Sequence, residues 1–309
     1  MPQPRHLVKC EKSGYRLIGK NQHSAIEVCR WCKSVLNGGK GCYKQAWFGI
    51  NSHRCLQMTP SLLCNLRCQF CWRRFDLKKR RINEWDKPEH ILEEAVKTQK
   101  NLLMGFGGNP KTSKELFKES LKPNQFAISL DGEPTLYKKL PELIKKIKST
   151  GSTVFLVTNG TNPSMLKKLI EKSAEPTNLY ISIYGTSEKM YKKVCNPLIT
   201  NVFKRVKKSL KLMKKFKEAR TVFRITAVKN MTMVDSEGYS KLIKIAEPDF
   251  VEIKGYAWLG ESRQRLKNSN VPNMEELKEF AENIERFSGY KIKNEDERSR
   301  VVLLNKSEL

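Results

Sequence analysis

The stretch Cys64-Asn65-Leu66-Arg67-Cys68-Gln69-Phe70-Cys71 places three cysteines in the pattern C-x3-C-x2-C. Three thiolates on one short loop can hold three irons of a [4Fe–4S] cluster and leave the fourth iron without a protein ligand. An open iron of this kind can bind a chelating cofactor. Zinc is the alternative, but structural zinc sites usually complete four ligands by pairing two such units. Since the sequence offers no fourth ligand close to this loop, the spacing favours an iron–sulfur cluster.

This loop resembles the signature of the radical S-adenosylmethionine (SAM) superfamily. The resemblance implies that SAM binds the open iron through its amino and carboxylate groups, and that one electron cleaves the sulfonium to a 5′-deoxyadenosyl radical. A second segment, Asp131-Gly132-Glu133, resembles the glycine-rich turn that meets the SAM amino group. Asp131 stands where the common form has a first glycine, but Gly132 still permits close backbone approach. An ordinary turn would also explain this segment.

Three further residues are candidate SAM contacts. Asn159 follows an apolar run and is expected to contact the methionine or ribose part, although Asn-Gly is also an ordinary turn dipeptide. Ser182 can bond the SAM carboxylate or ribose through its hydroxyl. Arg224 can hold a carboxylate with its guanidinium, and a structural salt bridge is an equally good explanation.

Between residues 56 and 260, apolar runs alternate with basic amphipathic stretches. The runs are apolar throughout, as expected for strands covered by helices on one face and by a packed interior on the other. Repeating βα units predict an α/β fold, a partial (βα)6-type TIM barrel with its chemistry at the carboxyl ends of the strands. The cysteine loop follows the first run, 56–63. Further strands are expected at 126–130, 154–158, 179–183, 222–228 and 250–253, and helices at 87–104, 136–149, 164–172, 202–217 and 236–246.

Three segments are predicted along the chain. Residues 1–55 contain five cysteines and little periodicity, which indicates a metal-organised extension bearing a second cluster site. Residues 56–260 form the barrel. Residues 261–309 form a carboxyl-terminal extension, with a helix at 273–288, a charged connection at 291–300 and a final strand at 301–304.

Charge points to a polyanionic partner. The chain has 59 Lys and Arg against 32 Asp and Glu, a net charge of +27. Such an excess attracts nucleic acid through its phosphates. A thermophile's lysine-rich surface is the alternative, but there glutamate usually rises together with lysine. The basic stretches at 78–81, 204–217 and 263–267 are candidate phosphate contacts. Trp72, Trp85 and Trp258 are candidates for stacking on a base, with core packing as the alternative.

Composition also limits where the protein works. No run of about 20 apolar residues occurs, so no membrane span is expected. The amino terminus lacks the apolar segment of a secretory signal. Nine cysteines in such a chain argue for metal or redox chemistry in a reducing compartment, not for a disulfide scaffold. We expect a cytoplasmic monomer.

Three amino-terminal cysteines suggest a second metal site. Cys29, Cys42 and Cys55 are separated by 13 residues each, and widely spaced single thiolates can form a second open cluster. Zinc is a serious alternative, because Cys29 and Cys32 form a C-x2-C pair that would complete four ligands with Cys42 and Cys55. Spacing alone favours neither.

The stretches 41–45, 52–60, 64–72 and 129–137 resemble the archaeal 4-demethylwyosine synthase family, and the resemblance covers most of the chain. Members of that family build the tricyclic wyosine core on N1-methylguanosine at position 37 of phenylalanine tRNA, using pyruvate carbons. The resemblance therefore implies a SAM-dependent condensation of methylated tRNA with pyruvate. It implies that the target guanosine leaves the stack of the anticodon loop.

The same resemblance assigns roles to individual residues. It places one [4Fe–4S] cluster on Cys64, Cys68 and Cys71. It places a second [4Fe–4S] cluster on Cys29, Cys42 and Cys55, and leaves Cys10 and Cys32 outside the family pattern. It gives Lys44 a Schiff base with pyruvate, whereas a lone lysine in so basic a chain is usually a solvated charge. Cys195 is expected to be a buried small side chain.

Two other functions are compatible with these features. A different radical SAM RNA-modifying enzyme, of the methylthiotransferase kind, also carries an extra three-cysteine cluster but has no need of Lys44. A non-catalytic zinc and RNA-binding protein would hold stoichiometric zinc instead of iron with acid-labile sulfide. For the wyosine-forming lyase, a separate flavodoxin-like or ferredoxin-like electron donor is expected, because no flavodoxin-like segment is present in the sequence.

Overall fold

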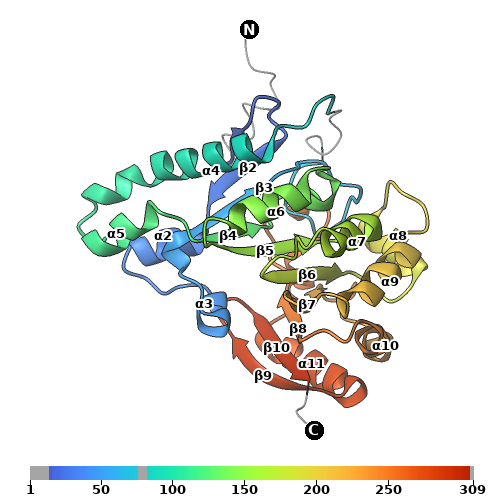
Figure 1. Ribbon diagram of the computed structural model, residues 1–309. Helices are drawn as coiled ribbons and strands as arrows, with labels where there is room; N and C mark the ends of the chain where they lie inside the picture. The colour runs from blue at the N-terminus through green and yellow to red at the C-terminus, as the bar shows by residue number, and fades with distance from the viewer. Residues whose placement is uncertain (1–13, 76–81, 307–309) are drawn as a thin grey trace. The chain divides into compact units, whose positions relative to one another are not determined.

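The computed structural model describes residues 14–75 and 82–306 (Figure 1). The chain divides into two compact units. Unit 1 contains Met1–Cys64 and Asp76–Leu156, and unit 2 contains Asn65–Phe75 and Val157–Leu309. The division into functional segments at residues 55 and 260 remains a prediction, as does the basic stretch 78–81, which lies outside the described residues.

The strands of unit 1 are β1 (Arg16–Ile18), β2 (Ser24–Val28), β3 (Cys55–Thr59), β4 (Gln125–Ile128) and β5 (Thr153–Thr158), whose last two residues belong to unit 2. The first three strands pair antiparallel, and β3, β4 and β5 pair parallel. The expectation of little periodicity before residue 55 was therefore wrong. Ala25, Ile26 and Val28 are buried, so this segment adds two strands to the sheet.

Among its described residues, unit 1 has the helices α2 (Arg30–Leu36), α3 (Tyr43–Phe48), α4 (Pro88–Leu103), α5 (Lys114–Ser120) and α6 (Leu140–Lys148). Short 3-10 helices lie at Ser52–Arg54, Met104–Gly108 and Pro134–Leu136. In α6, Leu140, Leu143, Ile144 and Ile147 are fully buried. Their spacing places them on one face of a helix, which confirms the helix predicted here. Its start moves from residue 136 to Leu140 because Pro134–Leu136 forms a 3-10 turn.

The sheet of unit 2 is made of β6 (Asn178–Ile183), β7 (Arg220–Ala227), β8 (Phe250–Gly255), β9 (Tyr290–Asp296) and β10 (Val301–Lys306). Strands β6, β7 and β8 run parallel, β10 pairs antiparallel with β8, and β9 lies outside β10. The charged connection expected at 291–300 was wrong in its first part, because β9 occupies it. An edge strand tolerates the lysines and acids that hid it in the sequence.

The strands of unit 2 alternate in polarity, which corrects the expectation that they are apolar throughout. Ser182, Arg224 and Glu252 stand in register on β6, β7 and β8, as do their neighbours Ile181, Phe223 and Val251. Successive side chains of a strand point to opposite faces. One face of this sheet is therefore apolar and the other carries polar groups.

The helices of unit 2 are α7 (Pro163–Glu171), α8 (Glu188–Cys195), α9 (Val202–Met213), α10 (Ser236–Ala246) and α11 (Met274–Ser288), with 3-10 helices η5 (Gly260–Gln264) and η6 (Asn268–Asn270). Helix α11 begins with a reciprocal hydrogen-bonded cap between Asn273 and Glu276. Helix α9 packs against both α7 and α10, and Figure 1 shows these helices along one side of the unit. Within the described ranges, no helix is long and apolar enough to cross a membrane.

Candidate active site

Unit 1 contains a cavity of about 140 Å³. Its wall brings together three cysteines, Cys29, Cys42 and Cys55, with Lys44 and the ring of Phe155. These residues come from the end of β2, the start of α3, the start of β3 and the middle of β5. The fold thus brings together, in one cavity, the three cysteines that the sequence suggested as a second metal site.

Cys32 points away from this cavity. Its thiol donates to the carbonyl oxygen of His53 at 3.3 Å, and its side chain packs with Val28, Leu36 and Leu103 in a buried cluster. Burial raises the pKa of this thiol to about 12. Because Cys32 bonds a backbone carbonyl within a hydrophobic cluster and does not line the cavity, this geometry favours the three-cysteine set over the four-cysteine zinc set.

One of the cavity cysteines, Cys29, is poised to act as a thiolate. A hydrogen bond from the Cys55 thiol lowers the pKa of Cys29 to about 6, with nearby backbone groups and the Lys44 charge acting in the same direction. The same hydrogen bond, together with burial, raises the pKa of Cys55. In the part of the chain that the structure describes, no group of three His, Cys, Asp or Glu side chains is arranged for a single metal ion. Three thiols at one cavity are the donor set of an open iron–sulfur cluster.

Lys44 is held in place by the fold of a short segment. The backbone N–H of Cys42 donates to the Ser52 hydroxyl at 2.9 Å, and the N–H of Ser52 donates to Gln45 Oε1 at 3.1 Å. A Cβ at Gly41 would lie 2.5 Å from Gln45 Oε1, so a side chain there would displace the amide that holds Ser52. The Lys44 ammonium lies 4.8 Å from the centroid of the Phe155 ring, and the lysine is half-buried.

The floor of the cavity comes from the parallel strands. Gln57, Ala127 and Phe155 stand in register on β3, β4 and β5 and all line the cavity. Gln125 lies one row earlier. Gln57, Gln125 and Phe155 were missed from the sequence, and their only signal was the period-two spacing of 55, 57 and of 125, 127.

The three-cysteine loop runs from Cys64, the last residue of the first segment of unit 1, into unit 2. Within unit 2 it is tied to α8, since the N–H of Arg67 donates to Cys195 O at 2.7 Å and that of Gln69 to Val194 O at 2.9 Å. Arg265 donates to the carbonyls of Gln69 and Cys71. The loop is therefore fixed by backbone contacts, and Cys195 is fully buried as expected.

Asn159 also holds this loop. Its Nδ2 donates to Asn65 Oδ1 at 3.0 Å, and its Oδ1 accepts from the N–H and hydroxyl of Thr161 at 3.0 and 2.6 Å. Asn65 in turn donates to the Thr161 hydroxyl at 2.7 Å. Both lone pairs of the Asn159 oxygen are thus used within unit 2. A SAM contact from Asn159 remains a prediction, and it would have to come from its amide nitrogen.

The predicted segment Asp131-Gly132-Glu133 packs against the stretch 61–63, which connects β3 to the cysteine loop. The N–H of Glu133 donates to Leu63 O at 2.6 Å. Gly132 has φ +70°, and a Cβ there would lie 2.0 Å from Ser61 O, so only glycine fits. Asp131 Oδ1 accepts from the Gly132 N–H at 2.7 Å. The buried Glu133 carboxylate accepts from the N–H and hydroxyl of Thr135.

In unit 2, Arg224 contacts a carboxylate of the protein itself. Its Nε lies 3.1 Å from Glu252 Oε1, and the Glu252 side chain is fully buried. Ser182 is buried next to Arg224 in the same row. The structural salt bridge considered for Arg224 is therefore present. Contacts of Ser182 and Arg224 with SAM remain predictions.

Comparison with known proteins identifies the family of the chain. Residues 58–243 match the family model of the radical SAM superfamily, and residues 245–306 match the model described as wyosine base formation. An S-adenosyl-L-methionine-dependent tRNA 4-demethylwyosine synthase of Pyrococcus abyssi is 43% identical over 302 residues, which cover 96% of this chain and 87% of the relative. A mouse relative, TYW1, is 38% identical over 297 residues, 95% of this chain and 40% of that protein.

Two solved structures are similar over nearly the whole chain. One is described as TYW1 with a lysine–pyruvate adduct bound, with a TM-score of 0.88, 32% identity and coverage of 98% of this chain and 96% of that one. The other is an archaeal TYW1, with a TM-score of 0.81, 30% identity and coverage of 99% and 97%. The α/β fold and the cysteine loop place the protein among radical SAM enzymes. More narrowly, the chain belongs to the family of SAM-dependent tRNA 4-demethylwyosine synthases.

Proposed function

We propose that this enzyme condenses N1-methylguanosine at position 37 of phenylalanine tRNA with pyruvate to form 4-demethylwyosine, and that Lys44 anchors the pyruvate. The observation that carries the proposal is that Lys44 shares one cavity with Cys29, Cys42 and Cys55. An amine and an open metal site in the same cavity can hold both functional groups of a 2-keto acid. The lysine–pyruvate adduct named for the similar TYW1 structure supports this assignment.

The cofactors in this proposal are SAM and two [4Fe–4S] clusters. Cys64, Cys68 and Cys71 would hold the first cluster, in a loop fixed by α8 and Arg265. Cys29, Cys42 and Cys55 would hold the second. Bound at the first site, the cluster and SAM supply the radical that removes hydrogen from the N1-methyl group. The barrel is proposed to be of the partial (βα)6 type, with the amino-terminal segment as its cluster-bearing extension.

Lys44 performs the covalent step. Its unprotonated Nζ attacks the keto carbon of pyruvate, a proton moves to the oxygen, and loss of water leaves a carbon–nitrogen double bond. Phe155 lies under the ammonium and is almost wholly buried, so this side of the amine faces a hydrocarbon wall. The carbon radical of the methyl group adds to the imine carbon, and the bond to the carboxyl carbon then breaks, so that the carboxyl fragment carries the unpaired electron away and the carbon–nitrogen double bond is restored. Attack of the guanine amino group on that carbon closes the ring and releases the Lys44 amine.

The experiment that tests this role is reductive trapping. Borohydride should reduce the imine and fix the pyruvate carbons on a peptide that contains Lys44. The Lys44→Ala variant should form neither the adduct nor the tricyclic product. Lys44→Arg should form neither as well, because guanidinium is a poor nucleophile. Lys40→Ala is the matched control, since Lys40 is exposed and precedes the same turn. Product formation by Lys44→Ala at the wild-type level would exclude Lys44 as the anchor.

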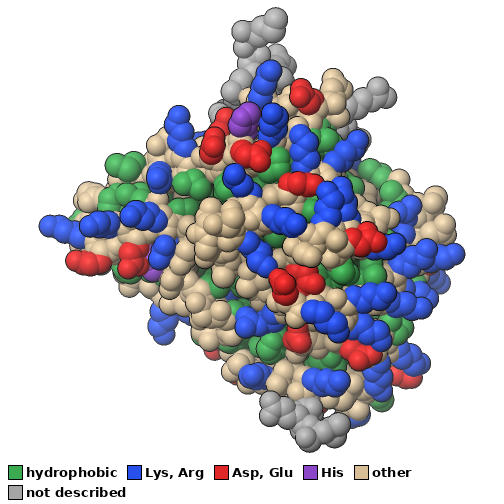
Figure 2. All heavy atoms as spheres, in the orientation of Figure 1, with side chains coloured by type: hydrophobic (Ala, Val, Ile, Leu, Met, Phe, Trp, Pro, Cys, Tyr) green, Lys and Arg blue, Asp and Glu red, His purple; other side chains and the backbone are tan. Residues whose placement is uncertain are grey.

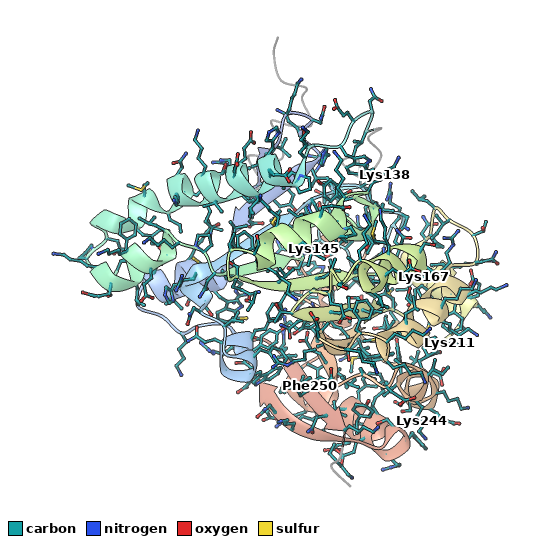
Figure 3. All side chains as sticks on the ribbon, in the orientation of Figure 1. Lys138, Lys145, Lys167, Lys211, Lys244 and Phe250 are labelled. Atoms are coloured by element: carbon teal, nitrogen blue, oxygen red, sulfur yellow. The ribbon has the colours of Figure 1, made fainter. Side chains whose placement is uncertain are left out.

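The tRNA is proposed to bind through the basic surface. Lys and Arg side chains are spread over the face shown in Figure 2. In unit 2, exposed Lys167, Lys211 and Lys244 lie on α7, α9 and α10 and point away from the strands (Figure 3). Such cations attract phosphates without reading sequence. We further propose that the enzyme works as a cytoplasmic monomer and takes electrons from a separate flavodoxin-like or ferredoxin-like protein.

A further inference from the structure

One tryptophan of this protein is exposed. Trp31, Trp47, Trp85 and Trp258 are at least half-buried, whereas Trp72 is 43% exposed. Trp72 follows directly after Cys71, the last cysteine of the three-cysteine loop. An exposed indole forgoes the hydrophobic free energy of its burial.

The exposed indole is held rigidly. The guanidinium of Arg73 lies 3.0 Å from the centroid of its ring and so covers one face. The carbonyl of Trp72 accepts from the N–H of Glu261 at 3.0 Å. Gly260 has φ +52°, and a Cβ there would lie 2.3 Å from the Trp72 carbonyl oxygen. Trp72 is therefore clamped between Arg73 and η5, and is positioned before any partner arrives.

A second apolar residue is exposed just before η5, the 3-10 helix that holds Trp72. Leu259, which precedes Gly260, is 46% exposed. The next turn carries Arg263, whose guanidinium lies 5.0 Å from the centroid of the Trp258 ring and donates to the Trp258 carbonyl. We name this surface the Trp72 platform; it consists of Trp72, Arg73, Leu259 and Arg263.

The two segments that build the platform are strongly basic. Residues 65–75 and 256–267 together carry six basic side chains and one acidic side chain. Arg67 and Arg73 are buried, the other four, Arg74, Arg263, Arg265 and Lys267, are partly or fully exposed, and the acid is Glu261. A flat aromatic surface among cations is the combination with which proteins bind single-stranded nucleic acid, since bases stack on the rings and phosphates meet the charges.

We propose that the Trp72 platform stacks an unpaired base of the RNA substrate beside the cysteine loop. This rests on the proposed function, in which the substrate is a tRNA loop. When the target guanosine leaves its stack, a neighbouring base loses a stacking partner. The indole of Trp72 supplies a replacement, and its attachment to Cys71 keeps that base next to the site of chemistry. The platform thus acts in binding and positioning.

The experiment measures the affinity for N1-methylguanosine-containing tRNA at several salt concentrations. Trp72→Ala should weaken binding about ten-fold or more, as truncation of a base-stacking aromatic does. The slope of log affinity against log salt should stay unchanged, because no phosphate contact is removed. Trp72→Phe should retain most of the affinity. Leu259→Ala should weaken binding without altering a residue next to Cys71.

Phe287→Ala is the matched control, since Phe287 is an aromatic residue of unit 2 that is 41% exposed. It should bind tRNA as the wild type does. A second readout is acrylamide quenching of tryptophan fluorescence. Bound tRNA should protect the wild-type protein from quenching, and this protection should be largely absent in Trp72→Phe, which lacks the exposed indole. Iron content and the melting temperature of each variant verify that it is folded and loaded.

The outcomes separate the platform from its alternatives. Wild-type affinity in both Trp72→Ala and Leu259→Ala would overturn the proposal. So would weaker binding with a reduced salt slope, which would indicate lost phosphate contacts. If tRNA affinity were unchanged but reduction by a flavodoxin slowed while reduction by dithionite did not, the surface would dock an electron-donor protein instead. Failure of the wild-type protein to bind tRNA at all would overturn the proposed function first.

Discussion

The ammonium of Lys44 lies over the face of the Phe155 ring, 4.8 Å from its centroid. One residue belongs to the short helix α3 and the other to β5. Phe48, at the end of α3, also contacts this ring, with the centroids 6.1 Å apart. Phe155 therefore supports both ends of the helix that carries the proposed nucleophile.

Removing this ring should slow imine formation. Phe155→Leu keeps a hydrophobic side chain but loses the aromatic face, whose attraction for a cation is worth about 0.5–2 kcal/mol. Because the ring attracts the ammonium and the protonated imine alike, we expect mainly a loss of orientation. The rate at which borohydride traps pyruvate should fall several-fold while iron content is retained. A trapping rate equal to that of the wild type would show that the ring does not orient the amine.

The two metal sites should be separable by mutation. Replacing Cys29, Cys42 and Cys55 together by Ala should remove roughly half of the iron and leave reductive SAM cleavage detectable, because the loop that holds the other cluster is intact. Cys32→Ala is the control and should keep all the iron, since its thiol bonds His53 O in a hydrophobic cluster. Loss of zinc instead of iron from the triple variant would identify a zinc site.

Asn159 should stabilise the cysteine loop. Asn159→Ala removes the donor to Asn65 and both acceptor contacts to Thr161, and such losses cost about 1–3 kcal/mol at buried sites. Iron should leave this loop faster in the presence of a chelator, measured in a protein that already lacks Cys29, Cys42 and Cys55. Asn162→Ala serves for comparison, because that amide caps α7. Equal rates of iron loss in the two variants would argue against a specific role for Asn159.

The pair Arg224–Glu252 should contribute to stability as well as to any SAM contact. Arg224→Ala would take the guanidinium partner from a fully buried carboxylate, a change that typically costs about 3–5 kcal/mol. The melting temperature should fall, and Arg224→Met combined with Glu252→Gln should recover part of it. Weaker SAM binding without any change in melting temperature would mean that Arg224 acts on the ligand alone.

Binding of tRNA should depend steeply on salt. With a net charge of +27, association releases counterions from the phosphates, so affinity should fall by about a factor of ten or more between 50 and 200 mM salt. Filter binding at a series of salt concentrations measures this slope. A flat dependence would exclude an interface dominated by phosphates. Discrimination between tRNAs should change less, because loop bases and shape carry it.

The sequence predicted the elements whose signals are local. Three signals depend only on residues close together in the sequence. They are the cysteine spacing, the mainly apolar runs of β4 to β8, and the amphipathic pattern of the helices α4, α6, α7, α9, α10 and α11. Strands β1 and β2 were missed because they are short and lie among cysteines, glycines and basic residues. Strand β9 was missed because charged residues are tolerated at an edge.

The site was harder to predict where it depends on partners distant in sequence. The sequence identified the three cavity cysteines as candidate ligands. It could not show that Cys32 lies outside this set, because that follows from the contact between Cys32 and His53, which the spacing of cysteines does not reveal. The bond between Asn65 and Asn159 joins residues 94 positions apart. Arg224 was compatible with two roles until Glu252 was found beside it. Burial of Trp85 and exposure of Trp72 likewise depend on tertiary packing.

The turn 41–45 limits how this active site can change by mutation. Cys42 and Lys44 lie on the same turn, so any movement of α3 carries the thiol and the amine together. A lysine shifted to position 45 would point about 100° away around the helix. It would also remove the Gln45 amide oxygen that accepts from the Ser52 N–H. Position 45 therefore cannot take over the role of Lys44 without both misdirecting the amine and breaking the contact that holds the turn.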